Sequence, residues 1–267
     1  MFCRRQMAVL IRGVVLTAGA WAADPESVVA IPGDAGAYTA ERWKRDWPGC
    51  RYEDGVKEGR VSVVRRDAGN ALRITCAAGK VGPAEGGAGW RWPVDRADSM
   101  TLSYTLHFDP DFEFVKGGKL PGLSGGPESV TGGRPATGTN GFSARLMWRR
   151  DGRGEAYIYH MHQPGKYGES FRFPDEFRFP RGEPVQVRLQ VAMIRAGQRD
   201  GQLRVWIQRK DAAERLMVER RDMEWRSVET FAADSVQFEV FHGGDDPTWA
   251  PTKACGLEID EIRVKRG

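Results

Sequence analysis

The segment GFSARLMWRRDGRGEAYIYHMHQ, residues 141–163, reads as two short β-strands joined by a tight turn. Two short runs of alternating residues flank Asp151–Gly154, a turn segment whose glycines can adopt the positive φ angles that tight turns require. Successive side chains on a strand point to opposite faces of the sheet. The first run therefore has an apolar face and a mainly polar face, which are Phe142, Ala144, Leu146 and Trp148 against Ser143, Arg145, Met147 and Arg149.

The second run repeats this two-faced pattern, with Tyr157, Tyr159 and Met161 against Ala156, Ile158 and His160. The register of the hairpin decides whether its two polar sets meet, because a one-residue slip inverts every side chain. A three-residue loop, 151–153, pairs Arg145 with Tyr159 on a shared face, whereas a two-residue loop puts the tyrosines behind it. We expect the three-residue loop, which is a common hairpin form. The alternative, a solvated face with incidental aromatic residues, has about equal weight on spacing alone.

The first 22 residues have the features of a secretory signal peptide. Arg4 and Arg5 precede a mostly apolar run that ends in small residues at Ala20-Trp21-Ala22. This run is too short for a membrane span, and no other stretch approaches that length. No glycine/serine linker or change of composition divides the rest. We therefore expect residues 23–267 to form one exported domain, secreted or periplasmic, without membrane attachment and monomeric.

The charge of the chain does not point to nucleic acid. The formal net charge of +4 includes Arg4, Arg5 and Arg12 of the predicted leader, so it falls to +1 without them. The basic character thus comes largely from the leader, and a nucleic-acid partner is not implied.

Cysteine and histidine usage indicates no metal site. Three cysteines remain after the leader, which allows one disulfide in an exported protein, and Cys50–Cys76 is preferred over the pairings with Cys255. No cysteine spacing is typical of a metal site, and the four histidines do not form a zinc pattern. His160 and His162 share a strand face, but ordinary polar strand residues explain them better.

The remaining sequence predicts an all-β protein. A short helical piece near Thr39–Asp46 precedes many short strand candidates with glycine- and proline-rich connections, a pattern typical of a β-sandwich or jelly roll of two antiparallel sheets. The candidates are Val61–Arg65, Ala71–Cys76, Met100–Phe108, Phe142–Arg149, Ala156–Met161, Val185–Ile194, Gln202–Gln208, Val236–His242 and Leu257–Val264.

Three connecting segments stand out. Val115–Asn140 contains KGGKLPGLSGG, a glycine-dense run around Lys119 that we interpret as a surface loop, although its glycines would also let the backbone approach a ligand. FHGGDDPTWAP, residues 241–251, follows the end of a predicted strand. The repeated FRFP, beginning at Phe171 and Phe177, is expected to form an exposed arch, and it suggests no mechanism.

Four of these motifs together resemble polysaccharide lyase family 14, which includes alginate lyases and related glucuronan-cleaving enzymes and adopts a β-jelly roll. The motifs are GGKLPGLSGG (117–126), GFSARLMWR (141–149), AYIYHMHQPGKYG (156–168) and FHGGDDPTWAP (241–251). The likeness runs from about Leu72, through VGPAEGGAGW at 81–90, to the C-terminus. Any one motif alone would be weak, but the ordered combination is specific.

The resemblance implies five working residues, which map onto Lys119, Ser143, Arg145, Tyr157 and Tyr159. It implies β-elimination on a uronic acid polymer, in which the proton at C5 is removed and the bond at C4 breaks. We expect Arg145 and Lys119 to neutralise the C6 carboxylate, so that no metal or cofactor is needed. We expect Tyr159 as the base, or as shared base and acid, and Tyr157 as its helper.

The remaining candidate residues are expected to bind the substrate. Ser143 is expected to orient the carboxylate or a sugar hydroxyl, because no Ser-His-Asp arrangement supports it as a nucleophile. Gln163, Lys166 and His242 are second-tier substrate-binding candidates.

Two other functions stay open. A hydrolase needs two carboxylates flanking the bond, and LEIDEIRV supplies Glu258 and Asp260 on one face, but it reads better as a closing strand. A non-catalytic jelly-roll module that binds acidic glycans is the main alternative, since an arginine and two tyrosines can also hold an acidic sugar. The polymer itself, and endo or exo action, are not readable from the sequence.

Overall fold

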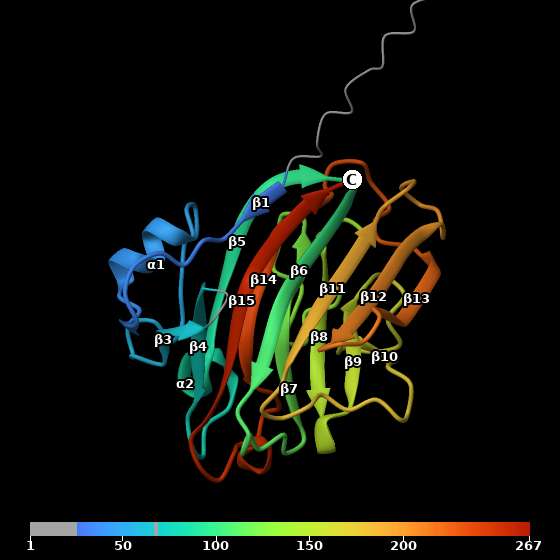
Figure 1. The fold of residues 1–267 in the computed structure, drawn as a ribbon. Coiled ribbons are helices and arrows are strands. Elements are labelled where there is room, and N and C mark those ends of the chain that lie inside the picture. Colours follow the sequence, from blue (N-terminus) through green and yellow to red (C-terminus); the bar gives the residue numbers. More distant parts are fainter. Residues whose placement is uncertain (1–25, 67–68) are drawn as a thin grey trace, which may run out of the picture.

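The computed structural model describes residues 26–66 and 69–267 as two antiparallel sheets packed face to face (Figure 1). The predicted signal peptide lies outside these residues. The nine strands of the larger sheet are β1 (Glu26–Val28), β2 (Gly36–Ala37), β3 (Val61–Arg66), β4 (Gly69–Cys76), β6 (Ser99–Phe108), β11 (Pro184–Ala192), β12 (Gly201–Arg209), β13 (Arg215–Met223) and β15 (Cys255–Arg266). Their order is β13-β12-β11-β6-β15-β4-β3-β2, with β1 paired to β15.

The smaller sheet has six strands, β5 (Ala88–Ala97), β7 (Gly117–Gly125), β8 (Phe142–Arg149), β9 (Gly154–Tyr159), β10 (Glu169–Arg172) and β14 (Ala233–His242). They follow the order β10-β9-β8-β7-β14-β5. Helices α1 (Ala40–Asp46) and α2 (Gly82–Gly86) are short. Helix α1 confirms the helical piece predicted near Thr39–Asp46, and Thr39 is its N-cap. Two 3₁₀ turns lie at Arg150–Gly152 and Pro247–Trp249. The prediction of an all-β sandwich of two antiparallel sheets is confirmed.

One continuous apolar core joins the two sheets. Inward side chains of β6, such as Leu102 and Leu106, are fully buried, and so are Leu146 and Trp148 of β8. Burial of this kind stabilises a fold by about 25 cal/mol for each Å² of apolar surface removed from water. None of the helices in the described residues is long and apolar enough to cross a membrane.

The KGGKLPGLSGG segment was predicted as a loop, and this prediction is wrong. Residues 117–125 form β7, which pairs with both β8 and β14 in the middle of the smaller sheet. A Cβ atom at Gly118 would lie 2.1 Å from the Trp148 ring, and one at Gly122 would lie 2.0 Å from the Ala144 carbonyl oxygen. These glycines therefore allow neighbouring strands and side chains to pack closely. The loop prediction had attributed them to backbone flexibility instead.

The hairpin has the predicted three-residue turn, but one residue earlier. The turn is Arg150–Gly152, and Arg149 pairs with Arg153 through a 2.7 Å backbone hydrogen bond. Asp151 (φ 58°) and Gly152 (φ 76°) take left-handed conformations that aspartate and glycine tolerate best. Arg145 consequently faces Tyr157 across the strands, and the predicted pairing with Tyr159 is wrong. Because the shift in register is two residues, the polar sets still share one face.

Two further expectations fail. The FRFP repeat is not an exposed arch, because Phe173, Phe177 and Phe179 are buried and pack on one another with ring centroids 5.1–6.2 Å apart. The preferred disulfide Cys50–Cys76 is absent, and the three described cysteines are free. Cys76 lies instead directly opposite Cys255 on β4 and β15.

Candidate active site

The polar side chains of the hairpin lie on the outer face of the smaller sheet, and strand pairing arranges them in rows. One row across β7, β8, β9 and β10 holds Lys119, Met147, Glu155 and Arg172. The next row holds Gly122, Arg145, Tyr157 and Ser170. Ser124, Ser143 and Tyr159 follow in the third row. All five residues suggested by the resemblance are thus brought to one face.

Arg145 is the most unusual residue of this face, because its guanidinium is buried and only partly paired. The residue is 1% exposed, and Nη1 donates to the carboxylate of Glu239 on β14. Nε and Nη2 are buried without any partner. These two N–H groups lie on the same edge of the guanidinium, the edge that binds a carboxylate in a bidentate manner. An unsatisfied buried polar group costs about 1–3 kcal/mol, and a charged one more, so this arrangement favours an incoming anion.

Lys119 lies on β7 in the same row as Met147, one row away from Arg145 of β8. Its Nζ is 2.9 Å from Met147 Sδ and 3.5 Å from the centroid of the Tyr157 ring. No ion pair of Lys119 is found in the described part of the chain. Burial, reinforced by the Arg145 and Arg149 cations, holds the pKa of Lys119 well below its ordinary value. The Lys119 amine therefore loses its proton at a lower pH than the amine of a surface lysine does.

Tyr157 is the more exposed of the two tyrosines on this face. It is half-buried, with the Lys119 ammonium nitrogen over its ring and the Arg149 guanidinium carbon 5.8 Å from the ring centroid. Burial and the neighbouring Tyr159 raise the pKa of Tyr157 despite the nearby cations. The two arginines lower this pKa by less than burial raises it, so Tyr157 keeps its proton and can act as a proton donor.

Tyr159 and Ser143 are both about 1% exposed, beneath the loop of residues 126–141. The Tyr159 hydroxyl accepts a 3.1 Å hydrogen bond from the backbone N–H of Gly133. The Ser143 hydroxyl donates to the Val130 carbonyl at 2.7 Å. Tyr159 still shares the side of the sheet with Arg145, whose guanidinium carbon is 5.9 Å from its ring centroid. In this arrangement both residues hold the loop against the site.

Of the three second-tier candidates, only Lys166 lies near these residues, because its side chain is close to Gly133 of the loop over Tyr159. Gln163 is turned toward its own loop, where Nε2 donates to the carbonyl oxygens of Gly165 and Tyr167. Lys166 is exposed, with Nζ 5.7 Å from the centroid of the Tyr167 ring. His242 is fully buried on the inner side of the sheet, where it stacks on Phe112 and bonds to the Glu113 carbonyl oxygen. His242 is thus separated from the polar face by the sheet itself.

Sequence reasoning missed two members of the site on β14. Glu239 is the partner of Arg145, and Gln237 donates to the Glu239 carboxylate at 3.0 Å. The signal was present in VQFEVFH, residues 236–242, where Gln237, Glu239 and Phe241 alternate with apolar residues. The strand was predicted, but only the sheet order places it beside β7 and across from Arg145.

The surroundings of this face are cationic. Five arginine side chains of the described chain make no hydrogen bond, ion pair or ring contact, and they are Arg51, Arg134, Arg150, Arg153 and Arg172. Arg51 lines a hollow beside β5, Arg134 belongs to the loop over Tyr159, and the other three surround the hairpin end. A set of unpaired cations around one face attracts an anionic ligand.

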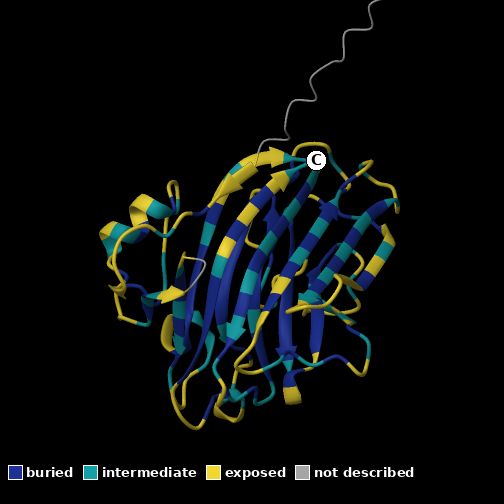
Figure 2. Ribbon diagram, viewed as in Figure 1, coloured by how far each residue is buried: buried dark blue, intermediate teal, exposed yellow. Residues whose placement is uncertain are grey.

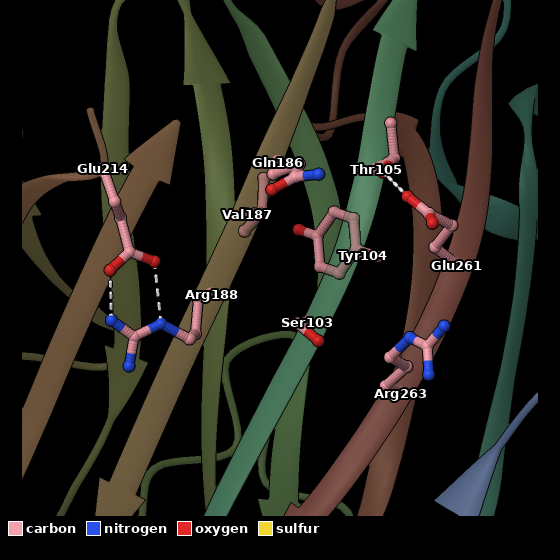
Figure 3. A pocket seen from close by; sticks show the side chains of 9 residues that line it. All are labelled: Ser103, Tyr104, Thr105, Gln186, Val187, Arg188, Glu214, Glu261 and Arg263. Carbon is pink, nitrogen blue, oxygen red and sulfur yellow. Dashed lines mark hydrogen bonds and ion pairs between the residues drawn. The ribbon is translucent and has the colours of Figure 1, made fainter. Parts of the chain in front are cut away.

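By contrast, the charged side chains that line a hollow on the outer face of the larger sheet are mostly paired (Figure 3). There Arg188 binds the Glu214 carboxylate with two N–H groups, and Thr105 donates to Glu261 at 2.7 Å. Its charged groups largely satisfy one another. Within residues 26–66 and 69–267, no group of three or more His, Cys, Asp and Glu side chains is arranged to hold a metal ion.

The fold and the site define a β-sandwich whose smaller sheet carries a cationic polar outer face. Comparisons with known proteins assign it to a family. The sequence profile of polysaccharide lyase 14 matches residues 65–259. Comparison with curated protein sequences found no match. The chain belongs to polysaccharide lyase family 14, and it is a polysaccharide lyase.

Solved structures with the same fold agree with this membership. The PL-14 alginate lyase from Aplysia kurodai is 23% identical, with a TM-score of 0.80 over 92% of this chain and 100% of that chain. An alginate lyase variant in complex with an alginate tetrasaccharide is 22% identical, with a TM-score of 0.78 over 92% and 98%. The endo-β-1,4-glucuronan lyase from the fungus Trichoderma reesei is 15% identical, with a TM-score of 0.54 over 82% and 92%. The jelly-roll prediction is confirmed.

Proposed function

We propose that this lyase cleaves a uronic acid polymer by β-elimination at the face that holds Lys119, Arg145 and Tyr157. The observation that carries the proposal is the unpaired, buried edge of Arg145, formed by Nε and Nη2. A carboxylate is the group that this edge binds best, and each residue of a uronate polymer carries one. Similarity to alginate and glucuronan lyases supports the same substrate class.

Arg145 neutralises the C6 carboxylate before the proton at C5 is removed. Loss of that proton spreads negative charge onto the carboxylate oxygens, and a guanidinium already aimed at them stabilises the charge without reorganisation. One such preorganised donor is worth about 3–4 kcal/mol in the transition state. Glu239 holds the opposite side of the guanidinium and so fixes its direction.

Lys119 is the base in this proposal, and Tyr157 is the acid. The lowered pKa of Lys119 favours the neutral amine that takes the C5 proton, and the raised pKa of Tyr157 favours the phenol that donates to the leaving oxygen. The C5–H electron pair forms the C4=C5 double bond, and the C4–O pair leaves with the oxygen. These roles differ from those expected from the sequence, where Tyr159 was the base, or shared base and acid, and Lys119 helped to neutralise the carboxylate.

Tyr159 and Ser143 act as positioning residues in this proposal. Their hydroxyl groups are engaged with the backbone of residues 130 and 133, so neither is open to a sugar. They secure the loop of residues 126–141, whose Arg134 side chain has no partner.

Ultraviolet absorbance tests the proposal, because elimination creates a C4=C5 double bond conjugated with the carboxylate. The protein is incubated with polymannuronate, polyguluronate and glucuronan, and with neutral mannan as a control polymer. We expect absorbance to rise with at least one polyuronate and not with mannan. New reducing ends without absorbance, or no product from any polyuronate, would refute the proposal.

A pair of variants links the reaction to this face. Tyr157→Phe removes only the hydroxyl, and general acid assistance of this kind contributes about 10²- to 10⁴-fold. Tyr104→Phe is the matched control, because the Tyr104 hydroxyl bonds the Pro121 carbonyl oxygen inside the sandwich. Tyr157→Phe is expected to lose activity by that factor, whereas Tyr104→Phe keeps it.

A further inference from the structure

A second polar hollow lies at the end of the β8–β9 hairpin, next to the proposed catalytic residues. Its volume is about 490 Å³, and its cationic lining consists of Lys116, Arg149, Arg150, Arg153 and Arg172. Three carboxylates, Asp151, Glu155 and Asp175, also line it, so the cations are in excess. We refer to this hollow as the hairpin pocket.

Two of the five cations are already engaged. Arg149 binds Glu155, with Nε 2.8 Å and Nη2 2.6 Å from Oε1, and Ser170 donates to the same oxygen at 2.9 Å. Lys116 binds the Thr248 hydroxyl and lies 5.6 Å from the centroid of the Trp249 ring. Glu155, only 3% exposed, is therefore a satisfied floor of the pocket. The exposed carboxylates of Asp151 and Asp175 make no interaction within the described residues, so three unpaired arginines stand against two unpaired carboxylates.

The remaining cations have no partner in the chain. The side chains of Arg150, Arg153 and Arg172 are exposed and make no interaction within the described residues. Most other arginines on the surface bind a carboxylate, as Arg188 and Arg204 do on the larger sheet. Three unpaired guanidinium groups around one concave site leave that site ready for an anion.

The hairpin pocket adjoins the proposed active site on the same face of the smaller sheet. Arg172 and Glu155 belong to the same row as Met147 and Lys119, and Arg149 lies near the Tyr157 ring. Moving from Tyr157 to Glu155 advances about 6.8 Å along the strand. That step is comparable to one sugar residue, so a polymer held at Arg145 can pass directly into the pocket.

We propose that the hairpin pocket binds the carboxylate of a further uronate residue of the polymer, away from the bond that is cleaved. Arg153 and Arg172 supply the contacts from either side of the hairpin end. The inference rests on the proposed function, since it takes the same polymer as ligand. It makes the enzyme favour chains long enough to occupy both the cleavage site and the pocket.

Chain-length dependence tests this subsite. The double variant R153Q/R172Q is compared with the wild-type enzyme on mannuronate and guluronate oligosaccharides, from the trisaccharide to the hexasaccharide. We expect KM to rise about three- to tenfold on the hexasaccharide, which is the range of partly exposed charged contacts. KM on the trisaccharide and kcat on both are expected to stay unchanged. R65Q is the matched control, because Arg65 is an exposed arginine on the larger sheet.

Direct binding separates failure of the subsite from failure of the proposed function. Calorimetric titration with the hexasaccharides and with a neutral mannohexaose measures affinity without requiring cleavage. Weaker hexasaccharide binding by R153Q/R172Q, with R65Q unchanged, supports the pocket even if no polymer is cleaved. Equal binding by wild type and double variant, an equal loss on all chain lengths, or equal affinity for mannohexaose overturns it, while cleavage by the wild type would leave the proposed function intact.

Discussion

The outer faces of the two sheets use polar residues in opposite ways. On the larger sheet, β6 alternates between buried and half-exposed residues along its whole length, and its outward serines and threonines remain in contact with water. On the smaller sheet, every residue of β8 before Arg149 is buried, and these residues include the polar Ser143 and Arg145. Figure 2 shows the contrast, with striped strands in the larger sheet and continuous dark blue along β8.

The contrast extends to the charges. Arg188 on the larger sheet has a carboxylate partner and packs 3.6 Å from the centroid of the Trp206 ring, whereas Arg145 keeps two buried N–H groups without any partner. An unpaired N–H on a buried cation costs free energy that an anionic ligand can recover. Arg226, the other buried arginine among the described residues, binds Asp98 and Glu229 and leaves only Nε without a partner. A buried arginine with its whole bidentate edge unpaired therefore marks the functional sheet more clearly than the number of polar residues does.

The largest expected effect comes from Lys119→Met. Loss of the base is expected to reduce kcat by about 10²- to 10⁴-fold, measured as ultraviolet absorbance on the best polyuronate. In the wild-type enzyme, kcat/KM is expected to rise with pH as the Lys119 amine loses its proton, at a pH below that of an ordinary lysine. Wild-type-like activity of this variant would remove the base from the proposal.

The same variant has a second readout in stability. Because the folded-state pKa of Lys119 is lowered, the unfolded chain binds more protons than the folded chain below the ordinary value of 10.5. Lys119→Met should therefore unfold at a higher temperature near pH 7, by about 2–4 °C for each kcal/mol relieved, and this gain should shrink as the pH approaches 10.5. Lys253→Met, at an exposed pair with Asp111, should show no gain.

Arg145→Lys is expected to have the next largest effect. The substitution keeps the positive charge near Glu239 but removes the bidentate edge, so kcat should fall by about 10²- to 10³-fold. Arg188→Lys, the corresponding change on the larger sheet, should leave kcat unchanged. The comparison between the two sheets would be wrong if both substitutions reduced turnover equally.

Ser143→Ala should have the smallest effect. It removes the hydrogen bond to Val130, so the free energy of unfolding should fall by about 1 kcal/mol. Backbone amides of residues 126–141 should exchange hydrogen faster, and KM should rise more than kcat falls. Ser103→Ala, on the wet face of the larger sheet, is the control and should change neither. A collapse of kcat with normal exchange in the loop would instead give Ser143 a direct role with the substrate.

Much of the candidate site was predictable because strand geometry is simple. Alternation alone places Ser143 with Arg145 and Tyr157 with Tyr159, and this assignment survived a two-residue error in register. The family motifs then identified the lysine, although Lys119 was expected in a loop. His242 was expected to bind the substrate, but it faces the core. Residues of β14 alternate between the two sides of the sheet, and Gln237 and Glu239 occupy the outer side, so His242 points inward.

The class of fold, the family and the residues that share the polar face follow from the amino-acid sequence, because a period of two and a set of ordered motifs are local properties. The three-dimensional arrangement was needed to see that Glu239 completes one side of Arg145, that Tyr159 is covered while Tyr157 is half-exposed, and that Lys119 is desolvated. Those outcomes depend on contacts between strands far apart in the chain. Burial and pairing are set by such contacts, and they decide which of the polar groups can exchange a proton with a sugar.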